Sequence, residues 1–246
     1  MCCFSRPVKS VTDTNIFARD SGAVMQVLVY QMKFSADEDM AMILPIPVRQ
    51  PSLEKHVRFF NLEKYPNFFD NMESGFPQPK SEGTFGGGST PRRRKLKVID
   101  VGVFEASYVP TVGEFSALDE RFRLPTNTWE KLPTYKTYGF VVFKLKKDHG
   151  KAHPMAFEFP RADPSKLYFP TVHIHDGEIH DKAEFDHTLY AQFSTGHRID
   201  ATNWMESIQP AGMFMNLTKC AALVDKNAHV YKRSVMGMQK NEDIVA

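Results

Sequence analysis

Three histidines and a glutamate lie close together in the stretch FPTVHIHDGEIH, which covers residues 169–180. These side chains are His173, His175, Glu178 and His180. Imidazole and carboxylate groups are common ligands of zinc, iron, manganese and copper in proteins. The residue types therefore suit a single metal ion, provided that the local fold brings the side chains together.

A tight hairpin would bring them together. Asp176 and Gly177 are a strong hairpin signal, because a type I′ turn needs positive φ angles at both central positions and this pair tolerates them. With these two residues as the loop, His173 faces His180, and side chains alternate between the two faces of the strands. This register places the polar side chains on one face and directs the other face toward a core through Val172, Ile174 and Ile179.

We therefore predict a mononuclear metal site with His173, His175 and His180 as ligands and Glu178 as a ligand or catalytic base. The metal is copper, zinc, iron or manganese, because geometry rather than residue type decides between them. A metal-dependent oxidoreductase is an enzyme class that such a site would suit. Two other interpretations stay open: a solvated face, or a metal-free cluster for acid–base chemistry or pH sensing.

The next stretch, EFDHTLYAQF, adds Glu184, Asp186 and His187. Either carboxylate would suit the orientation of a metal-bound imidazole through a hydrogen bond. We favour ordinary surface charges for the two carboxylates, and structural roles for His153, His197 and His229.

The cysteines Cys2 and Cys3 are the next candidates to join this site. A terminal Cys2, exposed by removal of Met1, would be a nucleophile activated by its own amine, and Cys3 would be a soft metal ligand. A hydrolase that uses Cys2 is therefore a third functional hypothesis, beside the alternative of two idle thiols. With Cys220 far away in the chain, no disulfide framework is expected.

Composition narrows the partners and the compartment. The chain has 246 residues, of which 42% are hydrophobic, and a formal charge of +2. A charge so close to balance makes nucleic acid an unfavoured partner, although residues 91–97, PRRRKLK, are strongly basic. We find no apolar run typical of a secretory signal or a membrane span, so we expect a cytoplasmic protein.

The alternative to an enzyme is a non-catalytic interaction or assembly module. Exposed aromatic side chains and the basic segment would then contact a protein partner, or the chain would form a homo-oligomer.

Hydrophobic patterning predicts an α+β fold, mostly antiparallel sheet with a few short helices, in two related hairpin-rich lobes. Residues 1–76 are the expected N-terminal lobe, 77–94 a mobile loop rich in glycine, proline and basic residues, and 95–246 the C-terminal lobe with the histidines. Strands are expected near 24–34, 40–48, 96–110, 138–147 and 153–160, and in 166–175. Helices are expected over 52–60, 68–72 and 112–125.

Two patterns relate the halves to each other and to known sequences. The segments that begin at Gln26 and Gly139 match as a duplicated hairpin, with convergence as the alternative. The motifs LPIPV (Leu44–Val48), VGVFEASYV (Val101–Val109) and FVVFKLK…HPMAFEF (Phe140–Phe159) resemble a bacterial family, the domain-of-unknown-function family 2330, over about residues 15–175. The resemblance implies a β-rich fold and no known activity, and this chain departs from it in lacking the secretory signal common in that family.

Overall fold

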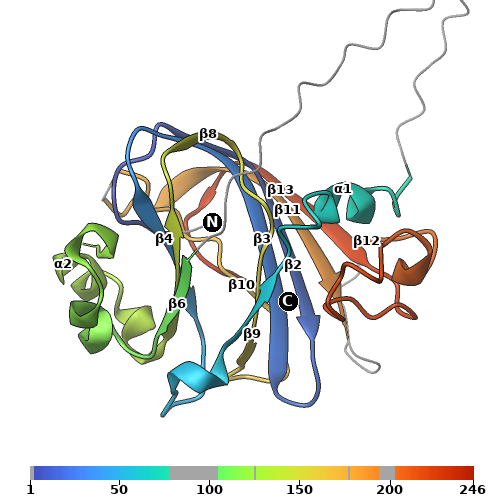
Figure 1. Cartoon of the computed structure of the whole chain (residues 1–246), viewed down its shortest axis with the longest axis horizontal. Coiled ribbons are helices and arrows are strands. Elements are labelled where there is room, and N and C mark those ends of the chain that lie inside the picture. The colour runs from blue at the N-terminus through green and yellow to red at the C-terminus, as the bar shows by residue number, and fades with distance from the viewer. Residues whose placement is uncertain (1–2, 78–104, 125, 177, 194–202) are drawn as a thin grey trace, which may run out of the picture.

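Two β-sheets packed face to face form the body of the protein (Figure 1). This computed structural model describes residues 3–77, 105–124, 126–176, 178–193 and 203–246. The expected loop over residues 77–94 lies outside the described residues, apart from Pro77.

The larger sheet has eight strands, in the order β12-β13-β11-β2-β3-β9-β5, with β8 paired to β3. The neighbours β2 and β11 are parallel, and all the other pairs are antiparallel. The strands are β2 (Ser10–Asp20), β3 (Met25–Ala36), β5 (Arg58–Asn61), β8 (Asp148–Lys151), β9 (Met155–Pro160), β11 (Lys182–Gln192), β12 (Met205–Glu206) and β13 (Tyr231–Lys240).

The smaller sheet has four antiparallel strands in the order β1-β4-β7-β6. They are β1 (Cys3–Phe4), β4 (Met40–Ile46), β6 (Glu105–Val109) and β7 (Gly139–Leu145). Two short strands, β10 (Tyr168–Phe169) and β14 (Ile244–Val245), pair separately and attach the end of the chain.

Strands that are apolar on both faces explain the layered packing. In β4, Met42 and Leu44 face the core between the sheets, while Ala41 and Ile43 face a second core on the outside of the small sheet. In β3 the same alternation divides the side chains between the central core and a third core outside the large sheet. A strand buried on both sides needs a cover on each face, and short helices and loops supply it.

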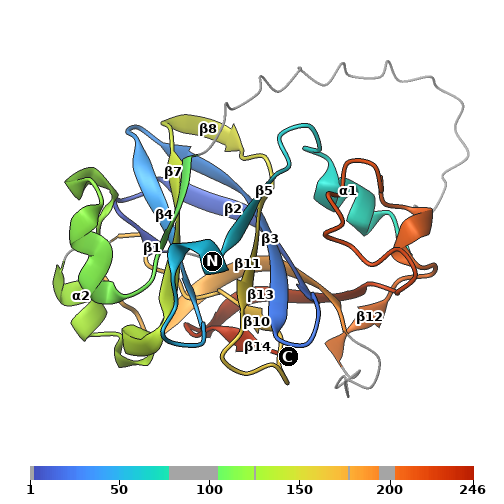
Figure 2. The ribbon, with the colours of Figure 1, turned by 60° about the horizontal axis from the view of Figure 1, so that its bottom comes forward.

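The covering elements lie at opposite ends of the molecule in Figure 2. The helix α2 (Thr126–Glu130) and the 3₁₀ turns Val112–Ala117, Glu120–Phe122 and Pro133–Thr137 pack on the small sheet. The helix α1 (Phe68–Glu73) and the segment 203–230, which contains the 3₁₀ turn Ala211–Met213, cover the large sheet. A further 3₁₀ turn covers Glu54–His56.

The sequence predicts the main strands and α1 well, but two helices are wrong. Residues 54–61 form a short turn and then β5, because Phe59 and Phe60 pair with β9 across a long sequence separation. Ser52, the expected helix cap, instead accepts a hydrogen bond from the Tyr108 hydroxyl at 2.8 Å. The expected helix over 112–125 is a pair of 3₁₀ turns, although Phe115 and Phe122 do share one core.

The mostly antiparallel sheet with few short helices is confirmed, whereas the division into two lobes is not. The larger and the smaller sheet each contain strands from before residue 77 and from after residue 94. The two matching segments do not form separate hairpins: β3 pairs with β9 and β4 pairs with β7, so each segment crosses from one sheet to the other. Within the described residues, no helix has the length and apolar character needed to span a membrane.

Candidate functional site

The histidine segment is an irregular strip, and it is held by both ends of the chain. Ile174 bridges to Cys3 in parallel orientation, and the Phe4 amide donates to the Ile174 carbonyl at 3.1 Å. From the C-terminal side, Asn241 Nδ2 donates to the carbonyls of His173 and His180, at 2.9 Å each. One amide side chain thus spans the two halves of the strip, where a strand ladder was expected.

The predicted hairpin is therefore wrong for the described part of residues 172–180, while Gly177 lies outside it. The expected inward face is partly right: Val172 and Ile174 are buried, and Ile179 packs against the same core. The hairpin ladder is missing because Cys3 and Phe4, from the far end of the chain, take the position beside Ile174.

Two of the predicted site residues point to solvent. The His180 ring lies 2.9 Å from the Asp176 carboxylate, and the side chains of both residues are 59% exposed. The Glu178 carboxylate is also exposed and pairs with Lys131 at 3.2 Å. The protein therefore does not bring His180 and Glu178 into the interior with His173.

A different histidine completes the cluster. The rings of His173 and His175 stack with centroids 5.3 Å apart, and His187 from β11 stacks on His173 at 5.1 Å. Phe185 lies closest of all, 4.3 Å from the His173 ring. We call His173, His175 and His187 the histidine stack. The sequence does contain a signal for His187: the alternation of side chains along β11 places Phe185, His187 and Leu189 on one face.

Burial keeps the histidine stack neutral. With burial as the largest cause, the pKa of His173 is lowered to about 2 and that of His175 to about 4, although the Asp176 carboxylate acts to raise the pKa of His175. Burial also lowers the pKa of His187, which is only 2% exposed. The buried Nε2 atoms of His173 and His187 have no hydrogen-bond partner among the described residues. Neutral imidazoles are competent metal ligands, so protonation does not argue against a metal.

The ring geometry, however, turns faces rather than nitrogen atoms toward one another. The two stacked pairs are within 27° and 28° of parallel. Within the part of the chain that the structure describes, no three His, Cys, Asp or Glu residues form a group that could hold a metal ion. Metal binding by this protein thus stays a prediction, and no particular metal is favoured.

Of the three cysteines, Cys3 and Cys220 are buried, and Cys2 lies outside the described residues. Cys3 is fully buried in the core outside the small sheet. Cys220 is also buried, and burial raises the pKa of its thiol to about 11. Buried thiols of high pKa are poor nucleophiles, because the thiolate is the reactive form.

Asp243 is a residue that the sequence did not single out. Its carboxylate accepts hydrogen bonds from the hydroxyls of Tyr135 and Tyr168, at 2.6 Å each, and from the amides of Thr171 and Val172, at 2.8 and 3.1 Å. These bonds join the turn before β7, β10 and the histidine segment to the end of the chain. Asp186, expected as a surface charge, similarly accepts from the amides of Asp13 and Thr14 where β2 is irregular.

A second region of interest exposes apolar side chains rather than side chains that could take part in catalysis. In residues 205–217, which we call the apolar strap, the exposed fractions are 50% for Met205, 62% for Ile208, 73% for Met213 and 41% for Leu217. The large exposed hydrophobic residues of the described chain are Val, Leu, Ile and Met, so the expectation of exposed aromatics is wrong there. Figure 1 shows the strap beside α1, on the opposite side of the sheets from α2.

The backbone of the strap is tied to neighbouring segments. The Ile208 amide donates to Gly75 O at 2.9 Å, and the Asn216 amide donates to Tyr65 Oη at 2.8 Å. At Gly75 a Cβ atom would lie 2.6 Å from the Phe214 ring, so only glycine allows this close approach.

Comparison with known proteins gives a likeness of fold alone. No family model matches the sequence, and no curated protein matches it, so the resemblance to the family of unknown function stays a prediction. The crystal structure of baculovirus P35 is similar with a TM-score of 0.57 and 14% identity, over 99% of this chain and 98% of that one. P35 in complex with caspase-8 has a TM-score of 0.45 and 12% identity over 95% of each chain. A mutated P35 after caspase cleavage also has a TM-score of 0.45, with 14% identity over 94% of this chain and 98% of that one. At this identity, the likeness to free P35 shows that the two chains share their overall fold.

Proposed function

We propose that this protein is a non-catalytic module that binds a protein partner through the apolar strap. The observation that carries the proposal is the exposure of Ile208, Met213 and Leu217 on a backbone that is held by the pairing of β12 with β13 and by hydrogen bonds to Gly75 and Tyr65. Apolar side chains on a fixed backbone lose little conformational entropy on binding, which favours association. Methionine suits such a surface, because its flexible thioether adapts to different partners.

The histidine stack supports a non-catalytic role. General acid–base catalysis needs a group that exchanges protons near the working pH and reaches the substrate. Burial in the core separates His173 and His187 from solvent, with exposed fractions of 8% and 2%. Their rings fill space beside Phe185, as apolar aromatic side chains would.

The fold of P35 supplies the first partner to test. P35 forms a complex with caspase-8, and its free form shares the fold of this chain. A shared fold does not establish a shared function. We use the likeness to P35 only to select a class of partner, and we use the exposed apolar side chains of the strap to select the binding surface. We therefore propose a cysteine protease of the caspase class as the partner.

A binding experiment separates the partner from the surface. Purified protein is mixed with the caspase-8 catalytic domain, and the complex is measured by size-exclusion chromatography beside the hydrolysis of a peptide substrate. We expect co-elution, and weaker co-elution for Ile208→Asp. The control Met238→Asp changes a residue that is 61% exposed on β13, and should bind as the wild type does. If the wild-type protein does not co-elute with the protease, the proposed partner class is wrong. If Ile208→Asp co-elutes as the wild type does, the proposed binding surface is wrong.

A further inference from the structure

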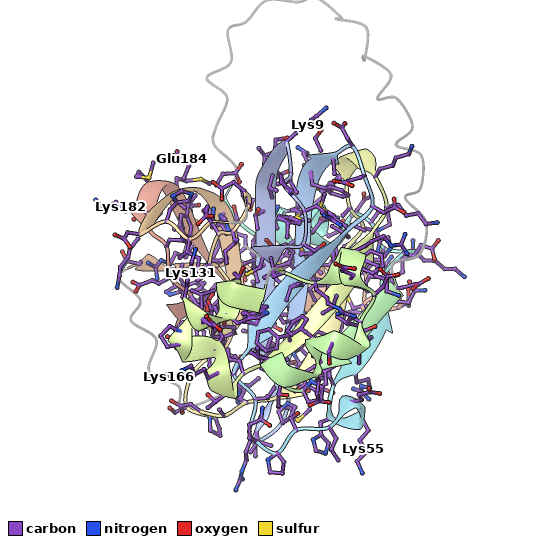
Figure 3. All side chains as sticks on the ribbon, turned by 90° about the vertical axis from the view of Figure 1, so that its left-hand side faces the viewer. Lys9, Lys55, Lys131, Lys166, Lys182 and Glu184 are labelled. Carbon is purple, nitrogen blue, oxygen red and sulfur yellow. The ribbon has the colours of Figure 1, made fainter. Side chains whose placement is uncertain are left out.

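A cleft of about 440 Å³ lies where β4 and β9 end, away from the apolar strap. Its walls include Val24, Pro47 and Pro160, and a bridge between Val48 and Arg161 joins the two segments beneath it. Figure 3 shows Lys55 and Lys166, which follow these two segments, at the same lower end of the molecule. The volume is in the range of small-molecule sites, and apolar walls are typical of them.

Two arginines, Arg49 and Arg161, line the cleft, and none of the described residues that line it is acidic. Arg161 has a side chain only 3% exposed, and it pairs with Asp20. Its Nη1 also donates to the Lys166 carbonyl at 2.9 Å, while its buried Nε has no hydrogen-bond partner in the described chain. The buried ion pair with Asp20 balances the formal charge of Arg161, so the net positive charge at the cleft comes from Arg49.

Further donors in the cleft are uncommitted. The exposed guanidinium of Arg49 and the hydroxyl of Tyr138 make no hydrogen bond with any described residue. Burial and the negative charge of Asp243 raise the pKa of Tyr138, so this hydroxyl stays protonated and able to donate. Gln50, in contrast, already donates to the carbonyls of Pro110 and Thr137, at 3.2 Å each, and so fixes the wall.

We propose that this cleft binds a small amphiphilic anion, with its apolar body against Val24 and the prolines and its carboxylate on Arg49 and Tyr138. An arginine binds a carboxylate through two parallel hydrogen bonds, and the phenol hydroxyl adds a third. The apolar walls exclude water from these bonds and so strengthen them.

Three probes test this chemistry by isothermal titration calorimetry on the full chain, with decanoate below its critical micelle concentration and decanol below its solubility limit. Decanoate has both the apolar body and the carboxylate, decanol lacks the charge, and acetate lacks the apolar body. We expect decanoate to bind at one site, and decanol and acetate to bind at least about tenfold more weakly, since hydrogen bonds to charged groups contribute this much. Equal binding of decanol, or no binding of decanoate, would overturn the proposal.

Variants then assign the site. Arg49→Gln should weaken decanoate binding about tenfold or more, and Tyr138→Phe by about threefold to tenfold. The matched control is Arg6→Gln, which removes another exposed arginine and should leave binding unchanged. Thermal melting confirms that each variant is folded. Wild-type affinity in Arg49→Gln, or equal losses in Arg49→Gln and Arg6→Gln, would show that the anion does not bind in this cleft.

Discussion

The histidine stack and the apolar strap use their residue types in opposite ways. Imidazoles, the side chains most associated with catalysis and metals, are packed as neutral rings in the interior at His173 and His187. Apolar side chains such as Ile208 and Met213, which usually fill cores, are held in solvent. Burial and partners, rather than residue type, thus indicate which region suits recognition.

An aspartate introduced into each of the two regions tests this contrast with the largest expected effect. His187→Asp buries a charge with no partner, and we expect a loss of about 3–5 kcal/mol in the free energy of unfolding. Met213→Asp adds a charge in solvent and should change stability by no more than about 0.5 kcal/mol. Urea unfolding measures both, and similar losses for the two variants would be incompatible with the contrast.

Removal of the Asp243 carboxylate should also loosen the histidine segment. Asp243→Ala leaves two buried tyrosine hydroxyls and two amides without their acceptor, so we expect a cost of about 2–4 kcal/mol. The neighbouring Glu242→Ala is the control, since its side chain makes only an exposed pair with Lys240. Chemical denaturation measures the free energy of unfolding of both variants. A value for Asp243→Ala equal to that of the wild type would show that the hydrogen bonds to Asp243 are not needed for stability.

Acid should unfold the protein through the histidine stack. An unfolded histidine has a pKa near 6.5, and burial lowers the pKa of folded His173 to about 2. Below pH about 6.5 the unfolded state therefore binds protons that the folded state does not. Stability is full above that pH and falls by about 1.4 kcal/mol per pH unit for each such histidine.

The matched variants for this pH dependence are His173→Phe and His180→Gln. His173→Phe should flatten the slope between pH 6 and pH 4 by about one proton, because the replaced ring cannot titrate. His180→Gln changes an exposed ring and should keep the slope. Unfolding curves across this range decide, and an unchanged slope in His173→Phe would mean that His173 is accessible to protons in the folded protein.

Distortion of the strap should have a modest effect on stability and a measurable effect on partner binding. Gly75→Ala places a Cβ atom 2.6 Å from the Phe214 ring, which must shift, at a cost of about 1–3 kcal/mol. We expect weaker co-elution with the protease than for the wild type. Gly113→Ala, where the nearest atom is 3.8 Å away, is the control. Full binding by Gly75→Ala would show that the strap geometry is unimportant.

Local patterns predict the strands and miss what distant contacts decide. Alternation in Met25–Ala36 and Gly139–Leu145 is a local property of the chain, and both strands form as expected. The helix expected over 52–60 fails because Phe59 and Phe60 gain more from pairing with β9 than helical propensity offers.

The candidate site was harder to predict, because the residues that hold it in place come from distant parts of the chain. His173 and His175 do lie together, since they are two residues apart in an extended segment. Local sequence holds no sign that Cys3 would displace the hairpin ladder or that Asn241 would close the loop. The strap is equally hidden, because exposure of Met213 depends on segments that are distant in sequence.

Hydrogen–deuterium exchange of the protein, free and with the caspase-8 catalytic domain, shows directly whether a protein partner binds on the apolar strap. We expect slower exchange of backbone amides in residues 205–217 in the complex, because the bound partner covers them. We expect unchanged exchange at Val172, His173 and His187, which are already buried in the free protein. Protection of these buried residues with an unchanged strap, or no protection anywhere, would contradict the proposed binding surface.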